Sequence, residues 1–200
     1  MRAAISGITY DEAFTYLAYA KLLADSPDLN TVKSIYWGSV ANNHWLNTLL
    51  IAFVCKITDI HYNEFLIRLL SVLAGCCYMV VVLWEYKRKN INGIQFMILS
   101  ACYYMEEFFG LARGYGMAAA LVLFGLLFYQ KWIDTNCLKH SALLLSIGCF
   151  ILSAYGNSVT LVVCFCIGIM MLYHLLAARQ LFYFLHKTWP ILLLCVVPGL

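Results

Sequence analysis

One stretch restricts the possible folds of this chain more than any other. Residues 65–84, FLIRLLSVLAGCCYMVVVLW, are almost wholly apolar and contain a single charged residue, Arg68. A helix needs about 20 consecutive apolar residues to cross the hydrocarbon core of a bilayer, so this run predicts a transmembrane span. The composition agrees, because 64% of the 200 residues are hydrophobic and only 12% are charged, about half the charged content of a soluble domain. We therefore expect an integral membrane protein.

Further apolar runs follow the first one. They predict spans at 91–105, 115–132, 141–155 and 159–176, and the start of a sixth at 191–200. The predicted fold class is thus all-α: a polytopic transmembrane helix bundle at 65–200 that continues beyond the last residue. Residues 1–64 form a separate predicted region, an external loop.

The loops between the predicted spans carry Lys and Arg unevenly, and such residues collect on the cytoplasmic side. The loop at residues 105–116 holds Arg113, and the loop at 153–158 holds no basic residue. The other three loops hold seven basic residues: Lys87, Arg88, Lys89, Lys131, Lys139, Arg179 and Lys187. This asymmetry predicts that residues 87–89 are cytoplasmic and that residues 1–64 lie on the periplasmic or lumenal face.

The external loop contains two short helical candidates, at 11–24 and 44–57. Apolar helices of this length are too short to cross a bilayer and suit an interfacial or re-entrant position. Nothing before Asp11 is long enough to carry the loop across the membrane. We therefore expect a membrane helix upstream of residue 1, with the chain as a fragment of a longer protein.

Two adjacent carboxylates, Asp11 and Glu12, stand at the head of this loop. Thr9 and Glu12 have the spacing of a capping box, which would make the pair the start of a helix. The alternative is a carboxylate base held at the membrane surface. Capping accounts for Glu12 better than for Asp11.

Two other polar stretches have a structural and a functional interpretation. In ANNHW, residues 41–45, Asn43 and His44 either cap a helix or bind a hydroxylic or anionic ligand. In EEFFGLARGYG, residues 106–116, the polar residues form either an external loop or a functional site at the membrane edge, as intramembrane ionisable residues often do. Three cations in or near these regions have a further alternative, in which the charge simply reaches the membrane interface: Lys56, Arg68 and Arg113.

Four segments together resemble the GT-C superfamily of integral-membrane glycosyltransferases, in particular the protein O-mannosyltransferase and aminoarabinose-transferase-like group. They are YDEAFTYLAY (10–19), NNHWLNTLLIAFVCKI (42–57), NEFLIRLLSVLAG (63–75) and ARGYGMAAALVLFGLLFY (112–129). Their order and spacing match the family pattern across residues 10–129. The chain departs from it at His44-Trp45-Leu46, where relatives often have His-Pro-Pro, and at Leu111, where many have an acid.

The resemblance implies a sugar transfer from a polyprenyl-phosphate donor to a hydroxyl acceptor on a protein, lipid or glycan. Asp11 would be the general base, with Glu12 supporting it. The donor phosphate would be bound by His44, Arg113 and Lys56. Acceptor binding or support would come from Asn43, Glu107 and Tyr115. The resemblance also implies a multi-pass protein, which we expect in the bacterial inner membrane with its active site on the periplasmic face.

Other chemistries have less support in the sequence. The nine cysteines lie mostly in apolar runs without metal-ligand spacing and indicate neither a zinc site nor a disulfide framework. We infer no metal-ligating residue and no cofactor, while a requirement for a divalent metal is left open, and the net charge of +3 is not typical of a nucleic-acid-binding protein. The alternative function is a polytopic transporter with an external Glu/Arg site, although no internal repeat supports it. A non-catalytic membrane scaffold also remains open at this stage.

Overall fold

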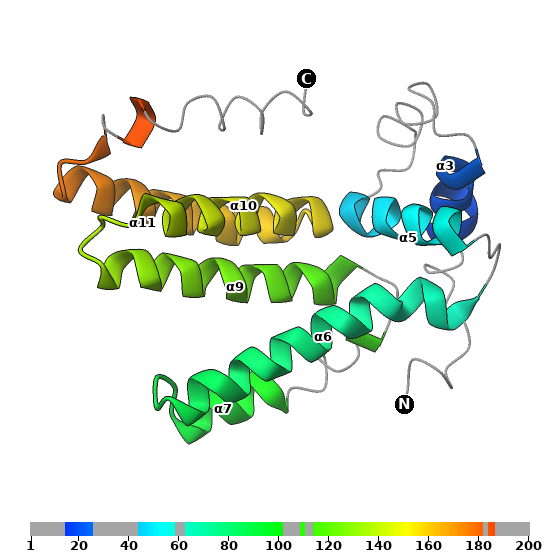
Figure 1. Cartoon of the computed structure of the whole chain (residues 1–200), viewed down its shortest axis with the longest axis horizontal. Helices are drawn as coiled ribbons and strands as arrows, with labels where there is room; N and C mark the ends of the chain where they lie inside the picture. Colours follow the sequence, from blue (N-terminus) through cyan, green and yellow to red (C-terminus); the bar gives the residue numbers. More distant parts are fainter. Residues whose placement is uncertain are drawn as a thin grey trace. The chain divides into compact units, whose positions relative to one another are not determined.

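The computed structural model describes residues 15–25, 44–58, 63–101, 109–110, 114–181 and 184–186. Nearly all of these residues are helical and none of them lies in a strand, which confirms the all-α class. Figure 1 shows the helices along the chain. They are η1 (a π-helix, Thr15–Ala20), α3 (Lys21–Asp25), α5 (Trp45–Thr58), α6 (Glu64–Lys87), α7 (Gly93–Ser100), α9 (Gly114–Asp134), α10 (His140–Gly156) and α11 (Thr160–Ala177).

Three helices in the described part of the chain are long and apolar enough to cross a membrane: Phe65–Lys87, Gly114–Asp134 and Thr160–Ala177. They coincide with the spans predicted at 65–84, 115–132 and 159–176, so the chain is a helical membrane protein. The segments expected at 44–57 and 141–155 are also helices, α5 and α10, but both are shorter. Residues 191–200 lie outside the described residues.

The span predicted at 91–105 corresponds to α7, which has eight residues. It begins where a capping box places it: the Asn92 side chain accepts from the Gln95 amide at 2.9 Å, and the Gln95 side chain accepts from the Asn92 amide at 2.8 Å. Residues 102–108 lie outside the described residues. Between α6 and α7, Lys89 adopts a left-handed backbone with φ 60°, and the rings of Tyr86 and Phe96 pack 4.6 Å apart across the turn.

The chain forms two compact units. Unit 1 consists of Met1–Ala120 and Tyr155–Ser158, and unit 2 consists of Leu121–Ala154 and Val159–Leu200. The boundary expected between residues 64 and 65 separated an external loop from a membrane region, and this division stays a prediction. The short segment Tyr155–Ser158 belongs to unit 1 although its neighbours in sequence belong to unit 2, and this bears directly on the candidate site.

In unit 2, α9, α10 and α11 pack through close contacts. The Ser146 hydroxyl donates to the carbonyl oxygen of Gly125 at 2.7 Å. A Cβ atom at Gly125 would meet the Phe150 ring at 2.9 Å, so the absence of a side chain lets α9 and α10 approach closely. The core is apolar and contains Tyr129, Trp132, Cys137, Ala142, Leu143, Phe150, Ile167, Met171, Leu175 and Phe184.

The turn after α9 is tied to this core. The indole nitrogen of the fully buried Trp132 donates to the Cys137 carbonyl at 2.9 Å. Asn136 and Cys137 both adopt left-handed backbone conformations, with φ 51° and 63°. The Cys137 thiol is thereby enclosed at the end of the helices.

Unit 1 contains an apolar cluster that joins η1, α3, α5 and α6. Its buried members are Tyr16, Ala20, Leu23, Ile51, Ala52 and Ile67. Buried polar residues are also present on α5 and α6: Asn47, Thr48, Arg68 and Ser71. Arg68 is only 1% exposed. Protein atoms therefore enclose its side chain, and the interpretation in which the Arg68 charge reaches the membrane interface stays a prediction.

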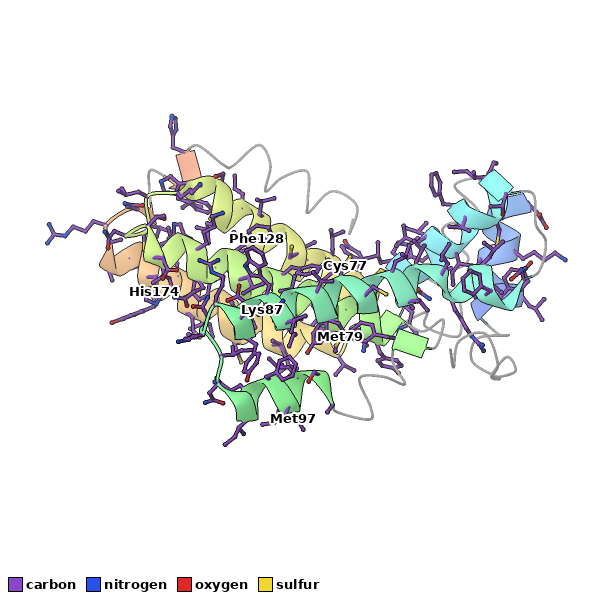
Figure 2. The ribbon with its side chains drawn as sticks, turned by 60° about the horizontal axis from the view of Figure 1, so that its bottom comes forward. Cys77, Met79, Lys87, Met97, Phe128 and His174 are labelled. Carbon is purple, nitrogen blue, oxygen red and sulfur yellow. The ribbon has the colours of Figure 1, made fainter. Side chains whose placement is uncertain are left out.

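Outward-facing apolar side chains cover the long helices. Figure 2 shows Cys77 and Met79 projecting from α6 and Met97 from α7, and all three are exposed. On α11 the exposed residues include Val162, Phe165, Ile169 and Tyr173. Such surfaces are expected of helices that face lipid rather than water.

Candidate functional site

His44 lies immediately before α5, and hydrogen bonds of both its backbone and its side chain hold it in place. Its carbonyl accepts from the Thr48 amide at 3.0 Å and from the Thr48 hydroxyl at 3.2 Å. Its Nδ1 atom lies 3.1 Å from the carbonyl oxygen of Gly156. A carbonyl oxygen can only accept, so this contact requires the proton of the imidazole to be on Nδ1.

Tyr115, in the first turn of α9, packs on the same imidazole. The two ring centroids are 4.6 Å apart with an interplanar angle of 69°, an edge-on arrangement. Edge-to-face contacts of this kind are favourable for aromatic rings. The structure thus brings together two of the residues predicted from separate motifs, His44 and Tyr115.

Two glycines make this meeting of segments possible. A Cβ atom at Gly114 would overlap the Gly156 carbonyl, and a Cβ atom at Gly156 would lie 3.3 Å from the Cβ of Ala118. Gly114 and Ala118 are one helical turn apart, so they form a small-residue notch on α9 that receives the end of α10. Neither glycine was predicted from the sequence as a site residue, although both occur in the motifs ARGYG and SAYGNS.

Lys56 does not lie close to His44. It lies in the last turn of α5 and is exposed, and its separation of twelve positions from His44 corresponds to about 18 Å along a helix. The other predicted site residues fall outside the described residues: Asp11, Glu12, Asn43, Glu107 and Arg113.

A band of buried polar residues on α5 and α6 was not predicted as part of a site. Arg68 and Ser71 are three residues apart and therefore share one face of α6. Asn47 and Thr48 are the buried polar residues of α5. The Ser71 hydroxyl is buried without a hydrogen-bond partner in the described part of the chain. Arg68 within an apolar run was a visible signal, but its burial depends on how α5 packs and could not be read from the run itself.

Within the described ranges, no three His, Cys, Asp or Glu side chains are grouped to hold a metal ion. The seven cysteines described there are all free. The local chemistry available is therefore that of an oriented imidazole with an aromatic neighbour, next to the carbonyl end of a helix.

No family model matches this chain, and neither the curated proteins nor the solved structures include a match to it.

Proposed function

We propose that this protein is a membrane glycosyltransferase that moves a sugar from a polyprenyl-phosphate donor to a hydroxyl acceptor on the external face of the membrane. One observation carries the proposal: His44 and Tyr115, which come from two of the segments that resemble the GT-C pattern, pack against each other. A contact between these two motifs is expected if both belong to one site, and it supports the proposal in this way.

The membrane topology predicted from the basic residues supports the same conclusion. The distribution of basic residues assigns three segments to the external face: residues 1–64, the loop that contains Arg113, and the loop at 153–158. His44, Tyr115 and Gly156 belong one to each of these regions, and their side chains and backbone are in contact. The distribution of basic residues and the contacts among His44, Tyr115 and Gly156 therefore agree, as expected if the site lies at the external face.

The proposed reaction assigns a task to each group. Asp11 takes the proton of the acceptor hydroxyl as its oxygen attacks the anomeric carbon. The bond between that carbon and the phosphate oxygen breaks, and the lipid phosphate leaves as an anion. His44 and Arg113 bind this anion through charge-assisted hydrogen bonds. Glu12, Asn43, Glu107 and Tyr115 support these groups or the acceptor.

Two geometrical features refine the proposal. The distance along α5 removes Lys56 from the set that acts together with His44. At about 21 Å, a 14-residue α5 is shorter than the hydrocarbon core of about 30 Å, so we place it at the interface, where the donor head group lies. The transporter alternative stays a prediction, because Glu107 and Arg113 lie outside the described residues.

The test is a transfer assay. The native protein is reconstituted into bilayers with a panel of polyprenyl-phosphate sugars, and sugar transfer to hydroxyl acceptors is measured. His44→Gln should reduce donor use by about tenfold or more, the scale of one lost charge-assisted hydrogen bond. Lys56→Gln, on the same helix, serves as the matched control and should stay close to wild type. If no donor of the panel supports transfer by the wild-type protein, the proposal is wrong.

A further inference from the structure

The end of α10 has a hydrogen-bonding need that its own helix cannot meet. The last four carbonyls of an α-helix have no partner within the helix, and Gly156 is the last residue of α10. Its carbonyl oxygen accepts from Nδ1 of His44, 112 positions away in the sequence. A His side chain is thus the C-terminal cap of a helix to which it is not connected locally.

The position of that carbonyl is set by close backbone packing. Gly114 and Ala118 on α9 form the notch that holds Gly156, with no room for a Cβ atom at Gly114. The same absent side chain would also come within 3.0 Å of Nδ1 of His44. The notch, the carbonyl and the imidazole therefore depend on one another.

We propose that Gly114 and Gly156 are positioning residues that hold the His44 imidazole in its Nδ1–H form and fix its orientation. This inference rests on the proposed function and specifies how the protein orients one of the side chains that bind the donor phosphate. In this form the Nδ1 atom carries the proton that is donated to the Gly156 carbonyl.

The contact with the carbonyl end of α10 anchors the ring through Nδ1. A hydrogen bond on one ring nitrogen commonly fixes the tautomer and the orientation of the whole imidazole. The backbone approach of Gly114 to Gly156 therefore determines which His44 tautomer the protein presents.

The inference is tested by nitrogen NMR on imidazole-labelled protein without any donor present. The chain has five histidines, and comparison with His44→Gln identifies the signals of His44. At a pH where the ring is neutral, wild type should show the Nδ1–H tautomer. Gly114→Ala should lose this signature. Gly110→Ala is the matched control, because a Cβ atom there has nothing within 4 Å, and it should keep the wild-type pattern.

Kinetics supply a second measurement. Gly114→Ala should raise the KM for the donor by about tenfold, as expected when one charge-assisted hydrogen bond is lost, while Gly110→Ala leaves it unchanged. A wild-type His44 in the Nε2–H tautomer would overturn the inference without any variant. So would a folded Gly114→Ala protein that retains the Nδ1–H signature. A correct tautomer together with no transfer from any donor would refute the transferase and uphold the positioning.

Discussion

The Nδ1 atom of His44 lies 3.1 Å from the carbonyl oxygen of Gly156 and thereby ties the start of α5 to the end of α10. This contact explains why the short segment Tyr155–Ser158 belongs to unit 1 rather than to the unit of its sequence neighbours. It also constrains the topology, because the two residues must lie on the same side of the membrane. That side is the external one if the basic loops are cytoplasmic.

The first prediction concerns sidedness. Single cysteines at exposed positions, Asp25→Cys and Lys89→Cys, are introduced into a variant without the native cysteines and treated with an impermeant thiol reagent. Position 25 should react from the external side and position 89 only after the membrane is opened. Reaction of position 25 from the cytoplasmic side alone would invert the topology and remove the site from the external face.

The second prediction concerns the packing of unit 2. Gly125→Ala places a methyl group 2.9 Å from the Phe150 ring, and overpacking of this kind typically costs about 1–3 kcal/mol. Gly148→Ala in α10 is the control, because its Cβ would have nothing within 4 Å and alanine favours a helix over glycine. Thermal unfolding in detergent should show a lower midpoint for Gly125→Ala only. Equal midpoints would mean that α9 and α10 do not approach closely at this point.

The third prediction concerns Arg68. Arg68 is buried, and removing a buried polar group so that its neighbours are left unsatisfied costs about 1–3 kcal/mol, and more where a charge is involved. Arg68→Ala should therefore strongly lower the unfolding midpoint, whereas Lys56→Ala, at an exposed position in the same unit, should have little effect. If both variants unfold like wild type, Arg68 is not buried in the α5–α6 region.

The fourth prediction concerns Cys137, in the turn between α9 and α10. Burial raises the pKa of its thiol, so less thiolate is present at neutral pH and alkylation should be slow. Asn136→Cys, at an exposed neighbouring position, is the control and should react faster. The difference should shrink as the pH rises and more of the Cys137 thiol ionises, and it should vanish on unfolding. Equal rates in the folded protein at neutral pH would show that the turn does not enclose the thiol.

The length of each apolar run was sufficient to predict the long helices. Every helix that crosses a bilayer must match its hydrophobic thickness, whatever the other helices do. The same argument located α5 from residues 44–57. The predicted start at residue 91 lies two residues before α7 begins at Gly93, where the local capping box of Asn92 and Gln95 sets it. A run of apolar residues does not reveal where such a cap starts a helix.

The site was predictable only in part. His44 and Tyr115 could be named because polar and aromatic residues stand out beside apolar runs. Their contact could not be derived, since it depends on Gly114 and Gly156, whose importance arises from a backbone approach between distant segments. Arg68 was visible as a charge, but the burial of its side chain is decided by helix packing, which the sequence of α6 alone does not contain.

The central claim is tested most directly by the transfer rate of Asp11→Asn in the native protein, measured beside its thermal stability. An amide keeps the size of the carboxylate but cannot accept the proton of the acceptor hydroxyl. General-base catalysis is worth about 10²–10⁴-fold, so transfer should fall by this order while the unfolding midpoint stays near wild type. Glu12→Gln should cost less, because Gln also serves in a capping box. Transfer by Asp11→Asn at the wild-type rate would contradict the general-base assignment and return the two acids to the start of a helix.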